Sequence, residues 1–133
     1  MRENVEILDV SHDGSIVEIR GTLPTIMLRI EIPYLRNMFP GEGNSFWVKI
    51  FGCESIEFYN WEEGTRTKDL NSIQSEEPEI LSVEQKGDIA HITCTKGELD
   101  ILYREIDFQL DSGDGVSFKE LADGCSRYWN RPR

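Results

Sequence analysis

Apolar and polar residues alternate with a period of two along much of this sequence, the pattern of β-strands with one buried face. The alternation is clearest in three consecutive runs: Ile80–Gln85, Ile89–Thr95 and Glu98–Tyr103. Lys86-Gly87 and Lys96-Gly97 separate these runs, and a short link with glycine suits a tight turn between antiparallel strands. Pairing the runs through both turns aligns Leu81, Ile92 and Ile101 in one apolar row. The stretch predicts a three-stranded meander with one buried face, which a two-residue slip of the first turn would preserve.

Five further runs have the same spacing and predict additional strands. They are Val5–Val10, Ile16–Thr22, Thr25–Ile32, Phe46–Phe51 and Ser55–Tyr59. Asp13-Gly14 predicts a hairpin between the first two runs, and residues 52–54 predict another between the last two. Residues 33–45 contain prolines and glycines and indicate a loop. Residues 60–78 are polar and have no assignment, with room for a short strand near Leu70–Ile73.

The alternation changes phase near residue 104. The row predicted to be buried is odd-numbered before this point (Leu99, Ile101 and Tyr103) and even-numbered after it (Ile106, Phe108 and Leu110). Arg104-Glu105 therefore predicts either a β-bulge that resets the strand or a bend into a second sheet. Beyond this point, three carboxylates are expected to point away from the apolar row: Glu105, Asp107 and Asp111.

The chain closes with a predicted helix. Ser117 and Glu120 have the spacing of a capping box, and Phe118, Leu121 and Cys125 follow with helical periodicity. We therefore expect residues 1–133 to form a single globular domain. Its fold class is mainly β, an antiparallel β-sandwich or rolled sheet of about eight strands with one C-terminal α-helix.

The charge of the chain restricts its partners. The sequence has 25 acidic and 14 basic residues, a net charge of −11, and residues 69–114 hold 12 of the carboxylates against three basic residues. Nucleic acid and anionic membranes are not expected as partners, because binding to phosphate depends on lysine and arginine. Three widely spaced cysteines without a CxxC motif, and no visible secretory signal, favour a cytoplasmic location.

Motifs that would support catalysis are weak. His91 and Cys94 are three residues apart on a predicted strand and so face opposite ways, which argues against a zinc site. Asp111–Gly115 lacks the acidic spacing of an EF-hand calcium loop, and there is no nucleophile elbow or phosphate-binding glycine motif. Glu105 and Asp107 have the residue types of a glycosidase pair, but solvated charge is the simpler interpretation. We expect no enzyme, no catalytic residue, no metal and no cofactor.

The remaining features predict a protein-binding module, of an inhibitor or immunity type, that neutralises a basic partner. The acidic face expected to bind it consists of Glu84, Glu98, Asp100, Glu105, Asp107 and Asp111. One alternative is a small-ligand or carbohydrate-binding β-sandwich, in which an aromatic patch would bind: Trp47, Tyr59 and Trp61. A second alternative is a structural subunit of a homo-oligomer that buries its outward apolar residues: Phe51, Ile89 and Leu102.

Overall fold

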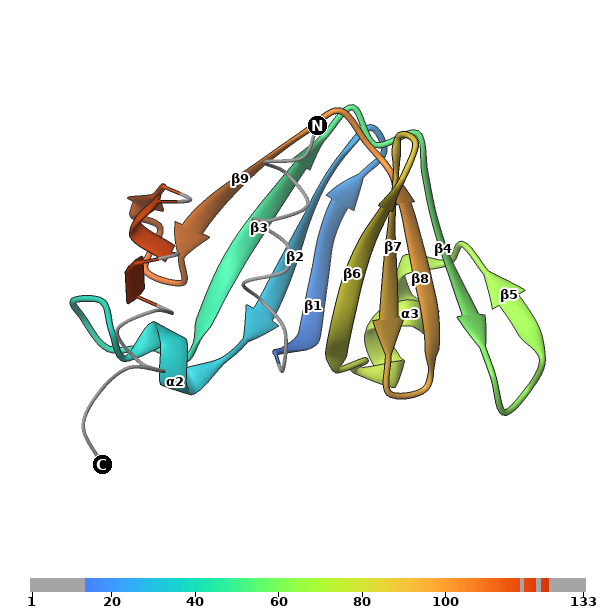
Figure 1. Ribbon diagram of the computed structural model, residues 1–133, viewed down its shortest axis with the longest axis horizontal. Coiled ribbons are helices and arrows are strands. Elements are labelled where there is room, and N and C mark those ends of the chain that lie inside the picture. Colours follow the sequence, from blue (N-terminus) through green and yellow to red (C-terminus); the bar gives the residue numbers. More distant parts are fainter. Residues whose placement is uncertain (1–13, 118, 122, 125–133) are drawn as a thin grey trace.

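The computed structural model describes residues 14–117, 119–121 and 123–124 and shows a mainly-β, sandwich-like protein with two antiparallel five-stranded sheets (Figure 1). Sheet A has the strand order β1-β2-β3-β9-β10, and sheet B has the order β5-β4-β8-β7-β6. The strands of sheet A are β1 (Ser15–Thr22), β2 (Thr25–Glu31), β3 (Ser45–Phe51), β9 (Glu105–Leu110) and β10 (Gly115–Val116). Those of sheet B are β4 (Ser55–Asn60), β5 (Thr65–Thr67), β6 (Ile80–Lys86), β7 (Ile89–Cys94) and β8 (Gly97–Leu102). The predicted fold class is confirmed, with ten labelled strands in place of about eight.

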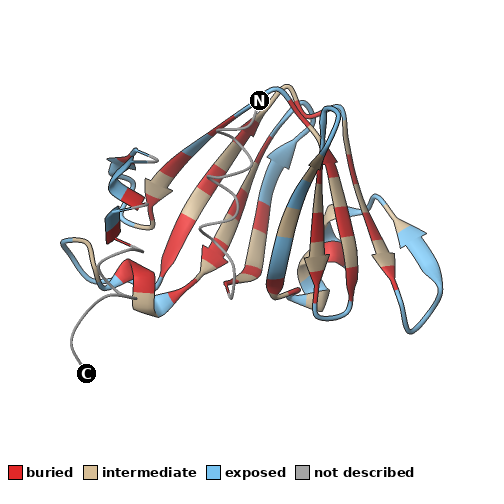
Figure 2. Cartoon of the chain, in the orientation of Figure 1, coloured by how far each residue is buried: buried red, intermediate tan, exposed pale blue. Residues whose placement is uncertain are grey.

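The space between the sheets holds one apolar core (Figure 2). Alternate residues of β2, namely Ile26, Leu28 and Ile30, are at most 1% exposed, and Ile56 and Phe58 of β4 are buried to the same degree. Side chains of successive strand residues point to opposite faces, so this alternation assigns one inner and one outer face to each sheet. The inward face predicted for Thr25–Ile32 is confirmed.

The predicted meander is present as β6, β7 and β8, but its register differs from the expected one. Ile92 lies opposite Val83 and Leu99, so both turns have slipped by two residues and the same faces remain buried. Gly87 has a φ of +63° and stands in the first turn, a conformation that favours glycine. The prediction for Leu81 was wrong, because a bulge between Ile80 and Ser82 leaves this side chain 46% exposed.

Two chain segments cross between the sheets at the top of the view in Figure 1. One joins β8 to β9, which confirms the predicted bend at Arg104-Glu105. The other joins β3 to β4, so the predicted hairpin of these two strands was wrong: β3 pairs with β2 and β9 instead. Hydrogen bonds from the Cys53 N–H to the Pro24 carbonyl and from the Glu54 N–H to the Leu102 carbonyl, both 2.8 Å, direct this crossing.

Strand β1 is hydrogen-bonded to the strand that follows it in the chain. It pairs with β2 through Thr22 and Thr25, whereas the predicted strand Val5–Val10 and its hairpin lie outside the described residues. At its start, β1 meets the two residues that precede β6, and Ser15 forms an antiparallel bridge with Glu79. The Ile16 N–H donates to the Pro78 carbonyl at 3.0 Å, and this contact joins the two sheets along one edge.

The predicted loop at residues 33–45 and the unassigned segment at residues 60–78 each contain a helix. Residues 33–45 include α2 (Pro33–Arg36), and residues 60–78 include β5 and α3 (Leu70–Glu76). The expected strand near Leu70–Ile73 was therefore wrong, because Asp69 caps a helix there by accepting from the Ser72 N–H at 3.2 Å. Helix α3 buries Ile73 completely in the core.

The C-terminal capping box is confirmed. The Glu120 N–H donates to the Ser117 hydroxyl and the Ser117 N–H donates to the Glu120 carboxylate, each at 3.1 Å. Leu121 on this helix is fully buried, while Phe118 and Cys125 lie outside the described residues. Among the described residues, the helices are too short or too polar to span a lipid bilayer.

Candidate functional site

Three of the predicted acidic residues lie together on the outer side of sheet B. Glu84 of β6 is opposite His91 of β7, and His91 is opposite Asp100 of β8. Glu98 stands two residues from Asp100 on the same strand and therefore on the same face. With two neighbouring aromatic residues, these side chains form what we name the outer B face: Tyr59, Trp61, Glu84, His91, Glu98 and Asp100.

His91 joins the two carboxylates of β8. Its Nε2 is 2.8 Å from Glu98 Oε1, and its Nδ1 is 2.5 Å from Asp100 Oδ1. Ionised carboxylates only accept hydrogen bonds, so both ring nitrogens can donate together only in the imidazolium form. The side chains of Glu98 and Asp100 remain 34% and 40% exposed, which leaves part of each carboxylate open to solvent.

Trp61 borders this ionic group and is the aromatic residue of the face that is most open to solvent. Its side chain is 46% exposed, and its indole Nε1 donates to Glu98 Oε2 at 3.0 Å. This hydrogen bond is the main reason that the pKa of Glu98 lies below its ordinary value, and the charge of His91 acts in the same direction. Trp61 and Glu98 therefore hold each other in a defined position where β4 ends and β8 begins.

Replacing Trp61 with Phe is expected to raise the pKa of Glu98 toward its ordinary value. The substitution keeps an aromatic ring but removes the N–H group that stabilises the carboxylate. Titration of the Glu98 side-chain carboxyl by NMR measures the effect, with Asp107 as an exposed carboxyl in the same molecule for reference. An unchanged Glu98 titration in the variant would contradict the contact.

Tyr59 has a partner of its own on the outer B face. The guanidinium of Arg66 lies 4.8 Å from the centre of the Tyr59 ring, and its Nη1 is 3.1 Å from Glu57 Oε1. The arginine therefore covers the tyrosine while it also pairs with a carboxylate. As a result, one side of the Tyr59 ring is covered by Arg66, whereas the predicted aromatic patch needs an uncovered ring to bind a ligand.

The other predicted residues are on the outer side of sheet A. Glu105 and Asp107 belong to β9, where Asp107 is opposite Lys49. Trp47 is in β3, and the Arg20 guanidinium lies 4.9 Å from its ring. The predicted acidic set is therefore divided between two sheets, and Trp47, Tyr59 and Trp61 do not share one sheet face.

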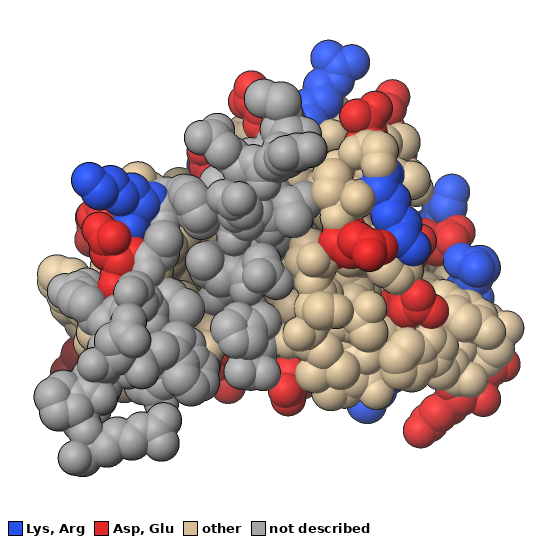
Figure 3. Space-filling view, in the orientation of Figure 1, with Lys and Arg blue, Asp and Glu red and all other residues tan. Residues whose placement is uncertain are grey.

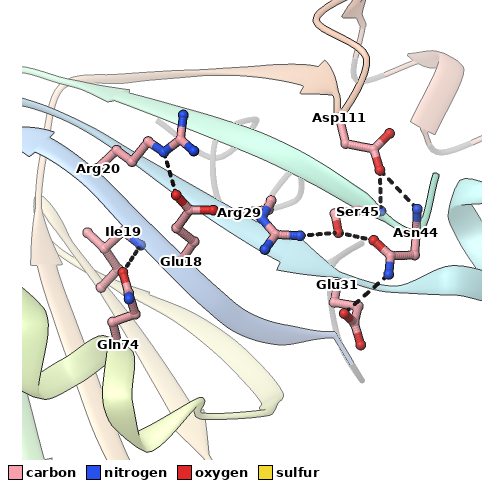
Figure 4. A network of polar contacts seen from close by, with 9 residues as sticks. All are labelled: Glu18, Ile19, Arg20, Arg29, Glu31, Asn44, Ser45, Gln74 and Asp111. Carbon is pink, nitrogen blue, oxygen red and sulfur yellow. Dashed lines mark hydrogen bonds and ion pairs between the residues drawn. The ribbon is translucent and has the colours of Figure 1, made fainter.

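The outer side of sheet A is rich in internal ion pairs. Glu18 pairs with Arg20 and, at 3.0 Å, with Arg29, as Figure 4 shows. Acidic and basic side chains are also interleaved on the face drawn in Figure 3, so the acidic excess does not form one unbroken patch there. On the outer side of sheet A, Glu18 is therefore already paired with arginines of the same sheet.

Asp111 has a structural position that the sequence did not reveal. Its Oδ1 accepts from Nε of Arg36 at 2.7 Å, and its Oδ2 accepts from the N–H groups of Asn44 and Ser45 at 2.9 and 3.1 Å (Figure 4). The Arg36 side chain is fully buried. Burial by itself raises the pKa of Asp111, but these bonds outweigh it and lower the pKa below the ordinary value. Asp111 stabilises the fold and is not an open part of an acidic face.

Within the described ranges, no group of three or more His, Cys, Asp or Glu side chains is placed to hold a metal ion. Cys94 is completely buried, and burial raises the pKa of its thiol to about 12. Burial also raises the pKa of Cys53. Because the thiolate is the reactive form, neither cysteine is suited to act as a nucleophile.

The fold and this face define a small, mainly-β, sandwich-like protein with an acidic and aromatic group on one sheet. Among known protein families, no family model matches the chain. Among curated proteins, no significant match to it is found.

Proposed function

We propose that this protein is a non-enzymatic binding module, of an inhibitor or immunity type, whose outer B face meets a basic protein partner. The observation that carries the proposal is the exposed indole of Trp61, held by Glu98 beside a second partly exposed carboxylate, Asp100. Tryptophan is frequent at the centres of protein interfaces. Carboxylates around it would complement lysine and arginine side chains and steer their approach.

One cation beside this face, Lys86, is weakly held and could give way to a partner. Lys86 Nζ is 3.6 Å from Glu84 Oε1, and both side chains are more than half exposed. Exposed ion pairs of this kind contribute little to stability, about 0–1 kcal/mol. Exchange of such a pair for one with a partner would therefore cost the fold little.

Ile89 and Leu102 extend the outer B face with apolar surface. They lie opposite each other on β7 and β8, and Ile89 is 36% exposed. An apolar pair next to an acidic group would contribute buried area to a complex. The same pair would also suit a homo-oligomer, which light scattering at several concentrations distinguishes from binding to another protein.

Neutralising Glu98 and Asp100 is expected to abolish capture of a basic partner. We would compare the wild type, a Glu98→Gln/Asp100→Asn variant and a Glu105→Gln/Asp107→Asn variant as bait for native lysate at low salt. The two variants carry the same change in net charge on different sheets. Wild type and the sheet A variant should retain a basic protein that elutes as salt rises, because salt screens charge pairs at the interface.

Two results would contradict this proposal. Equal retention by all three baits would show that Glu98 and Asp100 make no contribution. Equal loss from both variants would show that the partner responds to net charge and not to the outer B face. Circular dichroism of each bait checks that it is folded.

A further inference from the structure

A pocket of about 460 Å³ opens between the two sheets, away from the strand residues that form the outer B face. Its apolar lining comes from three different elements: Ile19 of β1, Ile56 of β4 and Leu70 of α3. Ile19 and Ile56 also belong to the core, so the floor of the pocket borders the sandwich interior. Clefts of roughly 300–1,000 Å³ that reach an apolar interior are typical of small-molecule sites.

Helix α3 fixes the wall of this pocket. Gln74 Oε1 of the helix accepts a hydrogen bond from the Ile19 N–H at 2.7 Å, as Figure 4 shows. Ile73 of the same helix is fully buried and anchors it from the other side. The pocket is therefore bounded by packed elements, and its apolar floor is formed in advance of any ligand.

The mouth of the pocket exposes an apolar side chain. Leu23, in the connection between β1 and β2, lines the pocket and is 47% exposed. A single exposed leucine is ordinary on a protein surface, but this one adjoins the apolar floor of the pocket. A ligand in the pocket would cover Leu23 and continue the apolar surface of the floor.

The charged groups at the rim select the class of ligand. Glu54 and Asp69 line the pocket together with a single cation, Lys68. Asp69 uses its Oδ2 for both contacts with Ser72, at 3.2 and 2.6 Å. The chain as a whole carries a net charge of −11, and a cleft with apolar walls concentrates the field of such a protein. Both the rim and the overall charge favour a cation.

We propose that this pocket binds a small organic cation with an apolar body, such as an alkylammonium or arylammonium ion. The apolar body lies on Ile19, Ile56 and Leu70, and the ammonium group lies at the rim near Glu54 and Asp69. This site is independent of the proposed function, since it uses none of the residues of the outer B face. Binding here and binding to a basic protein can therefore succeed or fail separately.

The test uses the full chain and two probes of the same shape, cyclohexylmethylammonium and cyclohexanecarboxylate. Methyl NMR spectra report contact with Ile19, Ile56 and Leu70 during each titration. We expect saturable shifts of these methyl groups with the ammonium probe, and at least about tenfold weaker binding of the carboxylate, which corresponds to 1.4 kcal/mol.

Three variants make the outcome specific. Glu54→Gln/Asp69→Asn should weaken the ammonium probe about tenfold, and asparagine still caps α3. Lys68→Gln should strengthen the same probe, because it removes the only cation among the lining residues. Thr22→Trp, at an exposed position of the lining, should fill the pocket and abolish binding of both probes.

Each alternative result overturns the proposal. Equal affinity for the two probes would show that the rim does not select charge. Ammonium binding that persists in the Thr22→Trp variant would place the cation elsewhere on the acidic surface. Absence of methyl shifts with either probe, in a protein whose spectrum shows a folded core, would show that the pocket takes no ligand of this class.

Discussion

Replacing Asp111 with Asn is expected to lower the free energy of unfolding by about 3 kcal/mol, as is typical when one partner of a buried ion pair is removed. The carboxylate lies at the end of β9 and is only 18% exposed, and the Arg36 side chain that it contacts is 0% exposed. Arginine stays charged when buried, so loss of Asp111 would leave an uncompensated guanidinium. The expected loss of stability is large because the ion pair is buried, even though the substitution replaces only one carboxylate oxygen with an amide nitrogen.

Asparagine has nearly the same shape as aspartate, but it cannot accept all the hydrogen bonds that Asp111 accepts. Both oxygens of Asp111 face N–H donors: Oδ1 faces Arg36, and Oδ2 faces the backbone of Asn44 and Ser45. An asparagine amide has one acceptor and one NH₂ group, so either orientation points a donor at a donor. Arg36 also donates to the carbonyls of Pro40 and Glu42, at 3.0 and 3.2 Å, so the loop between α2 and β3 should loosen as well.

Urea denaturation of wild type and variant measures the loss, and pH gives a second check. The folded-state pKa of Asp111 is lowered, so its stabilising effect is complete above the unfolded pKa and disappears as the pH falls through the folded pKa. The difference between the two proteins should therefore be constant near neutral pH and shrink in acid. Asp107→Asn, at an exposed position of β9, the strand that precedes Asp111, is the matched control and should change stability by less than about 0.5 kcal/mol. Equal stability of all three proteins would contradict the structural role of Asp111.

The sequence was most informative where local alternation decides which side of a strand is buried. The inner positions of β2 and the outer positions of Glu84, Glu98 and Asp100 follow directly from a spacing of two. A two-residue slip keeps that assignment, so the error in register did not move these carboxylates to the other face. The acidic part of the outer B face was predictable for this reason.

Long-range relations were not predictable in the same way. Whether β3 and β4 form a hairpin or pass into different sheets depends on contacts such as Glu54 with Leu102, which are distant in sequence. The pairing of Arg36 with Asp111 joins residues 75 positions apart. Helix α3 was not predictable from local pattern, because its capping residue, Asp69, lies within a polar stretch that has little apolar periodicity.

The position of Trp61 is an intermediate case. Its exposure beyond the end of β4 could be suspected from its place outside the alternating run, but its contact with Glu98 depends on the pairing of β4 with β8. The sequence therefore indicates Trp61 and Glu98 as candidate site residues, but it does not show that the two side chains are in contact. The separation of Trp47 from Tyr59 and Trp61 has the same origin, because it depends on which sheet each strand joins.

Replacing Gly97 with Ala is expected to lower the free energy of unfolding by about 3 kcal/mol, at the upper end of the usual cost of overpacking. Gly97 begins β8 opposite Asn60 of β4. A Cβ atom on Gly97 would lie 1.9 Å from the Tyr59 carbonyl oxygen and 3.0 Å from Cζ of Phe58, which is buried in the core. The nearest atom belongs to the backbone of a paired strand, so it cannot move aside without separating β4 from β8.

The same substitution should disturb the candidate site, since its residues flank this glycine. The Trp61 N–H donates to the Lys96 carbonyl at 3.1 Å, and the Trp61 indole donates to Glu98, so residues on both sides of Gly97 position the ring. We expect a shift of the Trp61 indole N–H resonance and a rise in the pKa of Glu98 as that hydrogen bond lengthens. Gly115→Ala in β10 is the matched control, because a Cβ there would have no neighbour among the described atoms within 4 Å. A Gly97→Ala protein as stable as this control, with an unmoved Trp61 resonance, would show that β4 and β8 do not approach as closely as the structure describes.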